Sequence, residues 1–242
     1  MTTSRWPASS QIRAALTAPT LHFDLKSRFL QGLTKPDIES VLAASIQRRF
    51  PASSIVTYQG DPADYLFLLT KGCARHFSVT EEGQKILLLW FAPGDVFGGL
   101  ALLPEPSSYL LCTEMVKDSC VMVWRRSEIR DLMARYPRLQ ENALSIASDY
   151  LVWFHASHMA LTSHTARQRL ARVLTSLAQG IGHKVQGGIE LNIKNEELAN
   201  AANVTPFTAS RLLREWKRNG AVSKSRGSIV LRAPQRLLAR QV

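Results

Sequence analysis

The sequence predicts an α+β protein with a small β sandwich or barrel, a long helix and a C-terminal helix-turn-helix that carries a wing. Three observations predict this fold class. Strand-like runs separated by turn residues recur at roughly ten-residue spacing over residues 54–125. Residues 138–163 contain neither Gly nor Pro. Two capped helical segments joined by a short turn lie within residues 195–221.

Composition excludes several classes of protein. The chain has 242 residues, of which 45% are hydrophobic and 20% charged, which suits folded cores and argues against disorder. Its longest apolar run, Ile86 to Ala92, is far shorter than the roughly 20 residues that span a bilayer, and its first 30 residues lack the apolar stretch of a secretory signal. Three cysteines (Cys73, Cys112 and Cys120) fit neither a disulfide framework nor a zinc pattern. We therefore expect a reduced, cytoplasmic protein.

The formal net charge of +11 is concentrated at one end of the chain. Residues 1–164 carry 16 basic and 15 acidic side chains, whereas residues 165–242 carry 14 basic and four acidic ones, a net of +10. A near-neutral large part joined to a small basic part is typical of a sensing or assembly domain joined to a nucleic-acid binder. Because Ile, Leu and Val recur throughout the basic part, we expect it to be folded rather than a solvated tail.

The N-terminal half is expected to form the β domain. Residues 1–22 are rich in Ser, Thr, Ala and Pro and are predicted to be flexible; residues 23–137 form the sensor-type domain. Short helices are expected over residues 23–49, with Thr34 as a cap. A turn and short helix are expected at residues 98–103, and a helix from Ser127 to about Tyr136. The expected strands are Ser54–Tyr58, Tyr65–Thr70, Ala74–Val79, Lys85–Phe91, Tyr109–Val116 and Cys120–Trp124, with a turn at Lys71-Gly72.

Residues 138–164 are predicted to be a dimerisation helix and hinge. An apolar line with spacings of 3, 4, 3, 4 and 3 residues runs along the helix, as in a heptad repeat. It consists of Leu144, Ala147, Leu151, Phe154, His158 and Leu161. Its length favours a dimer seam. The alternative is that this face packs on its own β domain.

Residues 165–242 are predicted to be a winged helix-turn-helix. A helix extends to Gly180, and Gly187-Gly188 forms a turn between two strands. Asn195 is expected to cap the first helix of the motif, and Thr205, followed by Pro206, the second. The inward face of the second helix comprises Ala209, Leu212, Leu213 and Trp216, and a hairpin over residues 222–232 forms the wing.

The outward face of the second helix is polar and cationic, which suits a DNA major groove. Arg211 is the candidate for a bidentate guanine contact. The candidate DNA-binding residues are Thr205, Phe207, Thr208, Ser210, Arg211, Arg214 and Lys217, with Lys224 and Arg226 of the wing near phosphates. The alternative is an ordinary helical hairpin with a solvated basic face.

The order of these parts resembles the cyclic-AMP receptor protein / fumarate-nitrate regulator (CRP/FNR) family of bacterial transcription factors over residues 25–235. The resemblance rests on Gln59-Gly60-Asp61, Tyr65-Leu66-Phe67-Leu68-Leu69, Lys71-Gly72, Glu82-Gly83, residues 92–98 (APGDVFG) and residues 199–220, especially Thr208 and Ser210-Arg211-Leu212-Leu213. It implies a jelly-roll-like, cyclic-nucleotide-binding-type β-roll, a long dimerisation helix and a winged helix-turn-helix. It also implies a homodimer that binds two-fold-related half-sites in double-stranded DNA, with RNA polymerase as a partner and no membrane association.

Two departures argue against cyclic AMP. Gly99 stands where the nucleotide-binding members carry the glutamate that engages the ribose, and Tyr109 and Leu110 replace the Arg-Ser pair. Losing that arginine removes the charge partner of a cyclic phosphate. Phe154 and His155 fall where the cyclic-AMP sensor places hydroxyl side chains. The effector pocket that the resemblance implies is Gly98, Gly99, Leu100, Ser108, Tyr109, Leu110, Phe154 and His155.

The effector is left open. The redox branch of the family holds an iron–sulfur cluster through N-terminal cysteines, and no cysteine precedes Cys73, which disfavours that cofactor. Haem is an alternative, with His76, His155, His158 and Cys73 as conceivable ligands, although a lone helix-face histidine is more often packed or solvated. Cysteine oxidation, an apolar effector and a pocket filled by its own side chains are further alternatives. No metal site is predicted.

The recognition helix also departs from the family. Phe207 replaces the glutamate that accepts a hydrogen bond from cytosine, and Pro206 precedes it; Arg211 is retained. Phenylalanine cannot accept a hydrogen bond but can contact a thymine methyl. We therefore expect the half-site to differ from the usual family sequences at that base pair.

Other functional classes are disfavoured. An enzyme is not expected, since no Walker loop, HExxH motif or nucleophile elbow occurs and no catalytic residue is assigned. A regulatory module of an enzyme or channel would need a catalytic or membrane segment. A non-specific architectural DNA binder would bind without regard to sequence.

Overall fold

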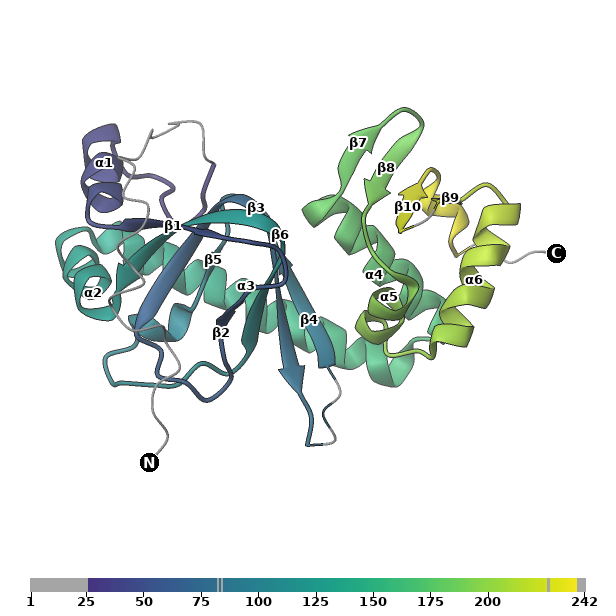
Figure 1. Ribbon diagram of the computed structural model, residues 1–242, viewed down its shortest axis with the longest axis horizontal. Coiled ribbons are helices and arrows are strands. Elements are labelled where there is room, and N and C mark those ends of the chain that lie inside the picture. The colour runs from purple at the N-terminus through teal and green to yellow at the C-terminus, as the bar shows by residue number, and fades with distance from the viewer. Residues whose placement is uncertain (1–25, 82, 84, 226, 239–242) are drawn as a thin grey trace. The chain divides into compact units, whose positions relative to one another are not determined.

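The structure, a computed structural model, describes residues 26–81, 83, 85–225 and 227–238; the predicted flexible segment 1–22 lies outside them. Its elements follow an α+β order (Figure 1). The first ten are α1 (Lys35–Ala43), β1 (Ile46–Phe50), β2 (Ile55–Thr57), β3 (Tyr65–Val79), β4 (Lys85–Phe91), β5 (Val96–Phe97), η2 (Gly99–Leu102), β6 (Cys112–Arg125), α2 (Arg126–Arg135) and α3 (Pro137–Ser163). The others are α4 (Ala166–Ile181), β7 (His183–Val185), β8 (Gly188–Leu191), α5 (Asn195–Ala201), α6 (Pro206–Arg218), β9 (Val222–Ser225), β10 (Ser228–Leu231) and η3 (Pro234–Arg236).

The chain divides into two compact units. The first consists of residues 1–74 and 93–146, and the second of residues 75–92 and 147–242.

The β domain contains one sheet and a helical cover. Six strands of the described residues form this sheet, in the order β1-β6-β3-β4, with β2 beside β6 and β5 beside β3. The buried core combines Leu66, Leu68 and Trp124 of the strands with side chains of α1, α2 and α3, including Ile129 and Leu139. The indole Nε1 of Trp124 donates to the Val41 carbonyl at 2.7 Å. The one polar atom of this large core side chain therefore has a hydrogen-bond partner.

The region before the sheet is only partly helical. Thr34 caps α1 as predicted, since its Oγ1 accepts from the Asp37 N–H at 3.4 Å. The prediction of short helices up to Arg49 is wrong, because Ile46–Phe50 forms β1. This segment pairs antiparallel with β6, with Ile46 opposite Val123, and the ladder hydrogen bonds outweigh its weak helical preference.

The predicted turn at Lys71-Gly72 is also wrong, because β3 continues through it. Gly72 has a φ of +106°, and a Cβ there would overlap the Ser119 side chain. The glycine thus permits a close approach of the neighbouring chain rather than a reversal. The strands expected on either side of Ser119 likewise merge into β6, which begins only at Cys112.

The second unit contains a helical core and a separate sheet. The Thr165 Oγ1 accepts from the Gln168 N–H at 3.3 Å and caps α4. Four strands of the described residues pair in the order β7-β8-β10-β9, so both predicted hairpins are present. They are joined where Leu191 lies opposite Ile229.

Candidate nucleic-acid interface

The helix-turn-helix is built by α5 and α6. The predicted inward residues Ala209, Leu212, Leu213 and Trp216 of α6 are all buried. They pack with α4, α5 and β10 in one core, and the Trp216 Nε1 donates to the Leu237 carbonyl at 2.9 Å. The apolar face therefore fixes which side of α6 points outward.

The first helix of the motif starts differently from the prediction. Asn195 is not its N-cap, because Lys194 holds that position. The Glu197 carboxylate accepts from the Lys194 N–H at 3.0 Å and so satisfies one of the free amides at the helix start. The Asn195 side chain instead donates to Ser210 Oγ at 3.1 Å and links α5 to α6.

The turn between the two helices is held by Arg169, a residue that the sequence patterns do not single out. Its guanidinium donates to three carbonyl oxygens, those of Ala202 at 3.0 Å, Asn203 at 2.9 Å and His164 at 2.8 Å. Asn203 has a φ of +48°, which an asparagine tolerates better than most residues. The arginine ties the turn to α4 and thereby orients α6.

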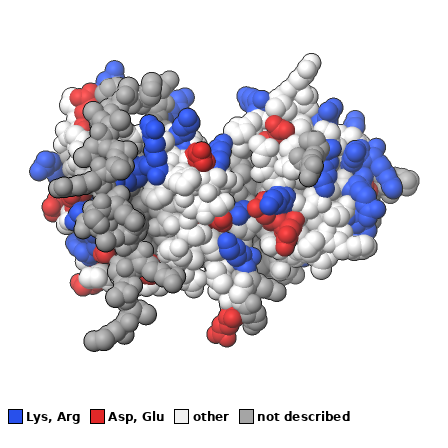
Figure 2. Space-filling model, viewed as in Figure 1, with Lys and Arg blue, Asp and Glu red and all other residues white. Residues whose placement is uncertain are grey.

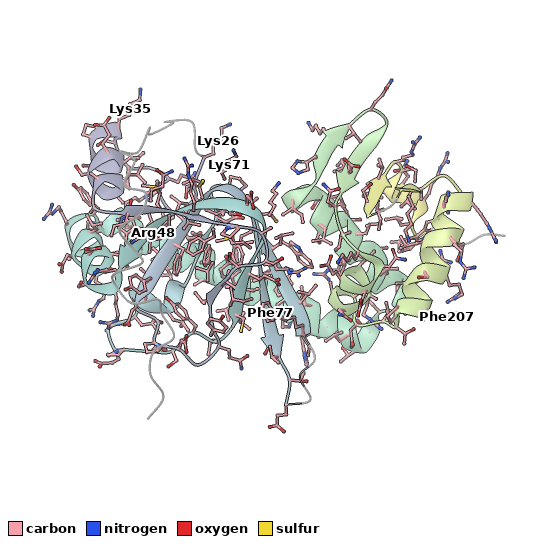
Figure 3. All side chains as sticks on the ribbon, viewed as in Figure 1. Lys26, Lys35, Arg48, Lys71, Phe77 and Phe207 are labelled. Atoms are coloured by element: carbon pink, nitrogen blue, oxygen red, sulfur yellow. The ribbon has the colours of Figure 1, made fainter. Side chains whose placement is uncertain are left out.

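The N-terminal turn of α6 presents few groups outward. Thr205 caps the helix as predicted, since its Oγ1 accepts from the Thr208 N–H at 3.1 Å. Its hydroxyl also lies 2.9 Å from the Thr208 hydroxyl. Phe207 is 73% exposed and lies at the end of α6 where the helix begins (Figure 3). Arg211, one turn further on, is exposed as well.

Part of the basic charge serves internal structure. Arg167 pairs with Glu215, Arg172 donates to a carbonyl of α3 at 3.3 Å, and Arg232 donates to Ser223 at 3.1 Å. Arg236 and Arg169 also donate within the unit. The charge directed to a ligand is therefore smaller than the net of +10 suggests.

Most of the other exposed cations among the described residues of this unit lie on α6 and the wing, while Lys184 and Lys194 lie outside them. Arg211, Arg214, Lys217 and Lys224 are exposed, and Figure 2 shows Lys and Arg side chains gathered over this end of the second unit. The Arg214 Nε stays within its own helix, donating to the Ser210 carbonyl at 3.4 Å. The wing candidate Arg226 lies outside the described residues. The exposed cations form a surface suited to phosphates.

An ion pair with Arg75 holds the carboxylate of Glu197 on α5. Arg75 contacts Glu197 at 2.5 Å, and both belong to the second unit. Burial alone would raise the pKa of Glu197, but the hydrogen bond from Arg75, helped by that from the Lys194 amide, lowers this pKa below its ordinary value. A lowered pKa stabilises the fold above the ordinary pKa, and this stabilisation is lost as the pH falls through the lowered one.

We expect Arg75→Met to raise the pKa of Glu197, because desolvation would then be opposed mainly by one backbone amide. The measurement is an NMR titration of the Glu197 carboxyl carbon in the full chain. Arg167→Met is the control, since it removes the ion pair with Glu215 and leaves the contacts of Glu197. An unchanged Glu197 pKa in Arg75→Met would contradict the assigned cause.

The predicted seam on α3 is exposed. Leu144, Leu151, Phe154 and Leu161 are 69%, 71%, 63% and 48% exposed, and Ala147 and His158 are exposed too. The buried residues of α3 lie near its two ends, away from the seam: Leu139, Asn142 and Ala160. The Asn142 amide donates to the carbonyls of Phe29 at 2.9 Å and Gln31 at 2.8 Å. At both ends, the helix therefore packs on its own chain through side chains other than those of the seam.

The residues of the predicted effector pocket are only partly brought together. The Tyr109 hydroxyl donates to the Tyr65 carbonyl at 2.8 Å and accepts from the Tyr65 N–H at 3.1 Å. Gly98 also approaches Tyr65, since a Cβ on it would lie 2.6 Å from that carbonyl oxygen. Burial raises the pKa of Tyr109 above its ordinary value, which keeps the phenol neutral. Tyr109 thus joins two backbone segments with its own side chain.

The other pocket candidates do not join this contact. Leu100 is half-buried at the start of η2, and Leu110 is 70% exposed. Gly99 and Ser108 are exposed. Phe154 and His155 are exposed side chains on α3 in the second unit.

The side chains that could ligate a metal or haem are dispersed. In the described part of the chain, no group of three or more His, Cys, Asp or Glu side chains is placed to hold a metal ion. Of the haem candidates, His76 packs edge-on against Phe91 with ring centroids 4.5 Å apart, and Cys73 is buried. Cys112 is buried too, and none of the three cysteines forms a disulfide.

The helices of the described ranges include none that is both long and apolar enough to cross a membrane.

Comparisons with known proteins agree with this organisation. Residues 47–136 match the cyclic nucleotide-binding domain family, and residues 168–240 match the Crp-like helix-turn-helix domain family. The cyclic AMP receptor protein of Thermus thermophilus is 28% identical over 85% of this chain and 93% of its own length. The CRP-like cAMP-activated global transcriptional regulator of Mycobacterium tuberculosis is 24% identical over 89% and 96%. The solved c-di-GMP responsive regulator CLP of Xanthomonas campestris superposes with a TM-score of 0.71 at 20% identity, over 82% of this chain and 99% of that one.

The β domain and the helix-turn-helix together define a DNA-binding transcription regulator with a cyclic-nucleotide-binding-like sensor domain. The chain belongs to the CRP/FNR family.

Proposed function

We propose that this regulator is a homodimer that binds two-fold-related half-sites in double-stranded DNA and distinguishes them by sequence. The observation that carries the proposal is α6, whose buried apolar face leaves Phe207, Arg211 and Lys217 exposed beside the wing. A helix with this arrangement suits the major groove. The exposed line on α3 provides a self-complementary surface for a second copy. We assign the chain no catalytic role, and RNA polymerase is a further proposed partner.

The test of this function is selection followed by competition. Double-stranded DNA selected from a random library should yield an inverted repeat, and this site should outcompete a scrambled duplex at fixed salt. Specific sites are typically bound 10³–10⁷-fold more tightly than non-specific DNA. Equal competition by both duplexes would instead identify a non-specific architectural binder.

We further propose that the β domain does not bind cyclic AMP through an arginine–phosphate contact. No arginine lies between Arg75 and Arg125. Two of the arginines that follow, Arg126 and Arg130, bind elsewhere, since they donate to the Pro104 carbonyl at 2.5 and 2.8 Å. A cyclic phosphate brought into this domain would have no charge-assisted partner of the kind its family uses.

Calorimetric titration with cyclic AMP is therefore expected to show no binding near micromolar concentrations, because an unpaired buried phosphate is costly. The cyclic AMP receptor protein of T. thermophilus, titrated in the same buffer, serves as the positive control. A clear micromolar isotherm for this chain would contradict the proposal.

Among the alternatives for the signal, an effector-independent regulator has a specific observation in its favour. Tyr109 satisfies both backbone atoms of Tyr65 with its own hydroxyl, so these polar atoms need no ligand. An absorption spectrum of the purified protein, with mass spectrometry of any co-purified molecule, tests this interpretation against a haem-sensing or redox-sensing one. A haem band or a stoichiometric small molecule would overturn it.

A further inference from the structure

On the N-terminal half of α6, one apolar and one cationic side chain remain available to contact bases. Thr205 is occupied by its contacts with the amide and hydroxyl of Thr208, and Ser210 accepts the Asn195 amide. These two polar candidates therefore serve the fold. Within the described residues, the side chains of Phe207 and Arg211 form no hydrogen bond or ion pair and are exposed. They are four positions apart and so lie on the same face of the helix.

Phe207 is exposed where burial would be favourable. It is 73% exposed, more than any other large apolar side chain in the part of the chain that the structure describes. It follows Pro206 in the first turn of the helix, the part of a recognition helix that approaches base edges. An apolar side chain there gains free energy only if the DNA offers an apolar group. In the major groove that group is the methyl on C5 of a pyrimidine.

We propose that Phe207 contacts a C5-methyl group, so that each half-site favours thymine or 5-methylcytosine over unmethylated cytosine at one position. This inference rests on the proposed sequence-specific DNA binding. The two pyrimidines carry the methyl at the same atom, and a phenyl ring has no acceptor for the amino group of cytosine. Four helix positions correspond to about 6 Å. The methyl therefore lies within about two base-pair steps of the guanine that Arg211 contacts.

Two series of DNA duplexes, whose members differ only in the C5-methyl group, test the contribution of that group to binding. In the selected operator, each thymine is replaced in turn by 2′-deoxyuridine, which removes only the methyl. We expect one position per half-site at which affinity falls about four-fold, or about 15-fold when both half-sites are changed, from the roughly 0.8 kcal/mol of one buried methylene-sized group. At that position, 5-methylcytosine should bind more tightly than cytosine by a similar factor.

Protein variants assign the effect to Phe207. Phe207→Ala should bind thymine and uracil operators equally, and likewise the two cytosine operators, while retaining its preference for guanine at the Arg211 position. Val185→Ala removes another partly exposed apolar side chain of the same unit and should leave methyl discrimination intact.

The outcomes separate this inference from the function on which it rests. A protein that binds its operator specifically but does not distinguish thymine from uracil at any position overturns the methyl contact alone. Methyl discrimination that persists in Phe207→Ala also overturns it. If no sequence is preferred over scrambled DNA, the proposed function and this inference both fail.

Discussion

Leu151→Glu is expected to convert the proposed dimer into monomers and to lower affinity for a two-half-site operator by about 10²–10⁴-fold, because the second half-site is then no longer bound intramolecularly. Leu151 lies at the middle of the exposed line on α3 and is 71% exposed. In a dimer, the substitution would bury two carboxylates without partners. Light scattering measures the mass, and titration of a labelled operator measures the affinity.

Leu151→Met is the matched control, since a volume-conserving apolar exchange keeps the seam closed. Affinity for an isolated half-site should be equal in the wild type and Leu151→Glu, because α6 is unchanged. A Leu151→Glu protein that remains dimeric would contradict the seam. A monomer that still binds the full operator with wild-type affinity would contradict the two-fold mode of binding.

The sequence predicted the helices of the second unit more closely than the strands of the β domain. Thr165 and Thr205 are caps that each accept a hydrogen bond from an amide three residues away, so their signal is local. The continuity of β3 through Gly72 depends instead on the close passage of Ser119, 47 positions along the chain. No local pattern distinguishes a glycine that serves such an approach from one that reverses the chain.

In the candidate interface too, local patterns predicted some features, while others depend on residues far apart in the sequence. The inward face of α6 follows from its periodicity, whereas the bond between Asn195 and Ser210 joins two helices and could not be inferred from either one alone. Arg169 carries the same charge as Arg211 in the sequence, yet it contacts three carbonyls of the turn and the preceding hinge. Counting charges therefore located the basic region but did not separate structural arginines from those available to DNA.

The second large effect is expected from Arg211→Ala, which should relax the choice of base at one pair in each half-site. A bidentate guanine contact is worth about 1–3 kcal/mol. Because a dimer carries two copies, the full operator should lose roughly 2–6 kcal/mol of binding free energy, with additivity between the distant half-sites. The measurement compares the selected operator with duplexes changed at each guanine, at one salt concentration.

Two further variants separate base reading from charge. Arg211→Lys keeps the charge but loses the planar fork, so it should lose discrimination while retaining the dependence of binding on salt. Lys217→Ala removes an exposed cation of the same helix and should weaken binding to all sequences alike, with a salt slope reduced by about 1 for each phosphate that is no longer neutralised. Arg211→Ala could instead weaken binding to cognate and scrambled DNA equally, which is the result expected for Lys217→Ala. Arg211 then binds a phosphate, and the guanine must be assigned to another side chain.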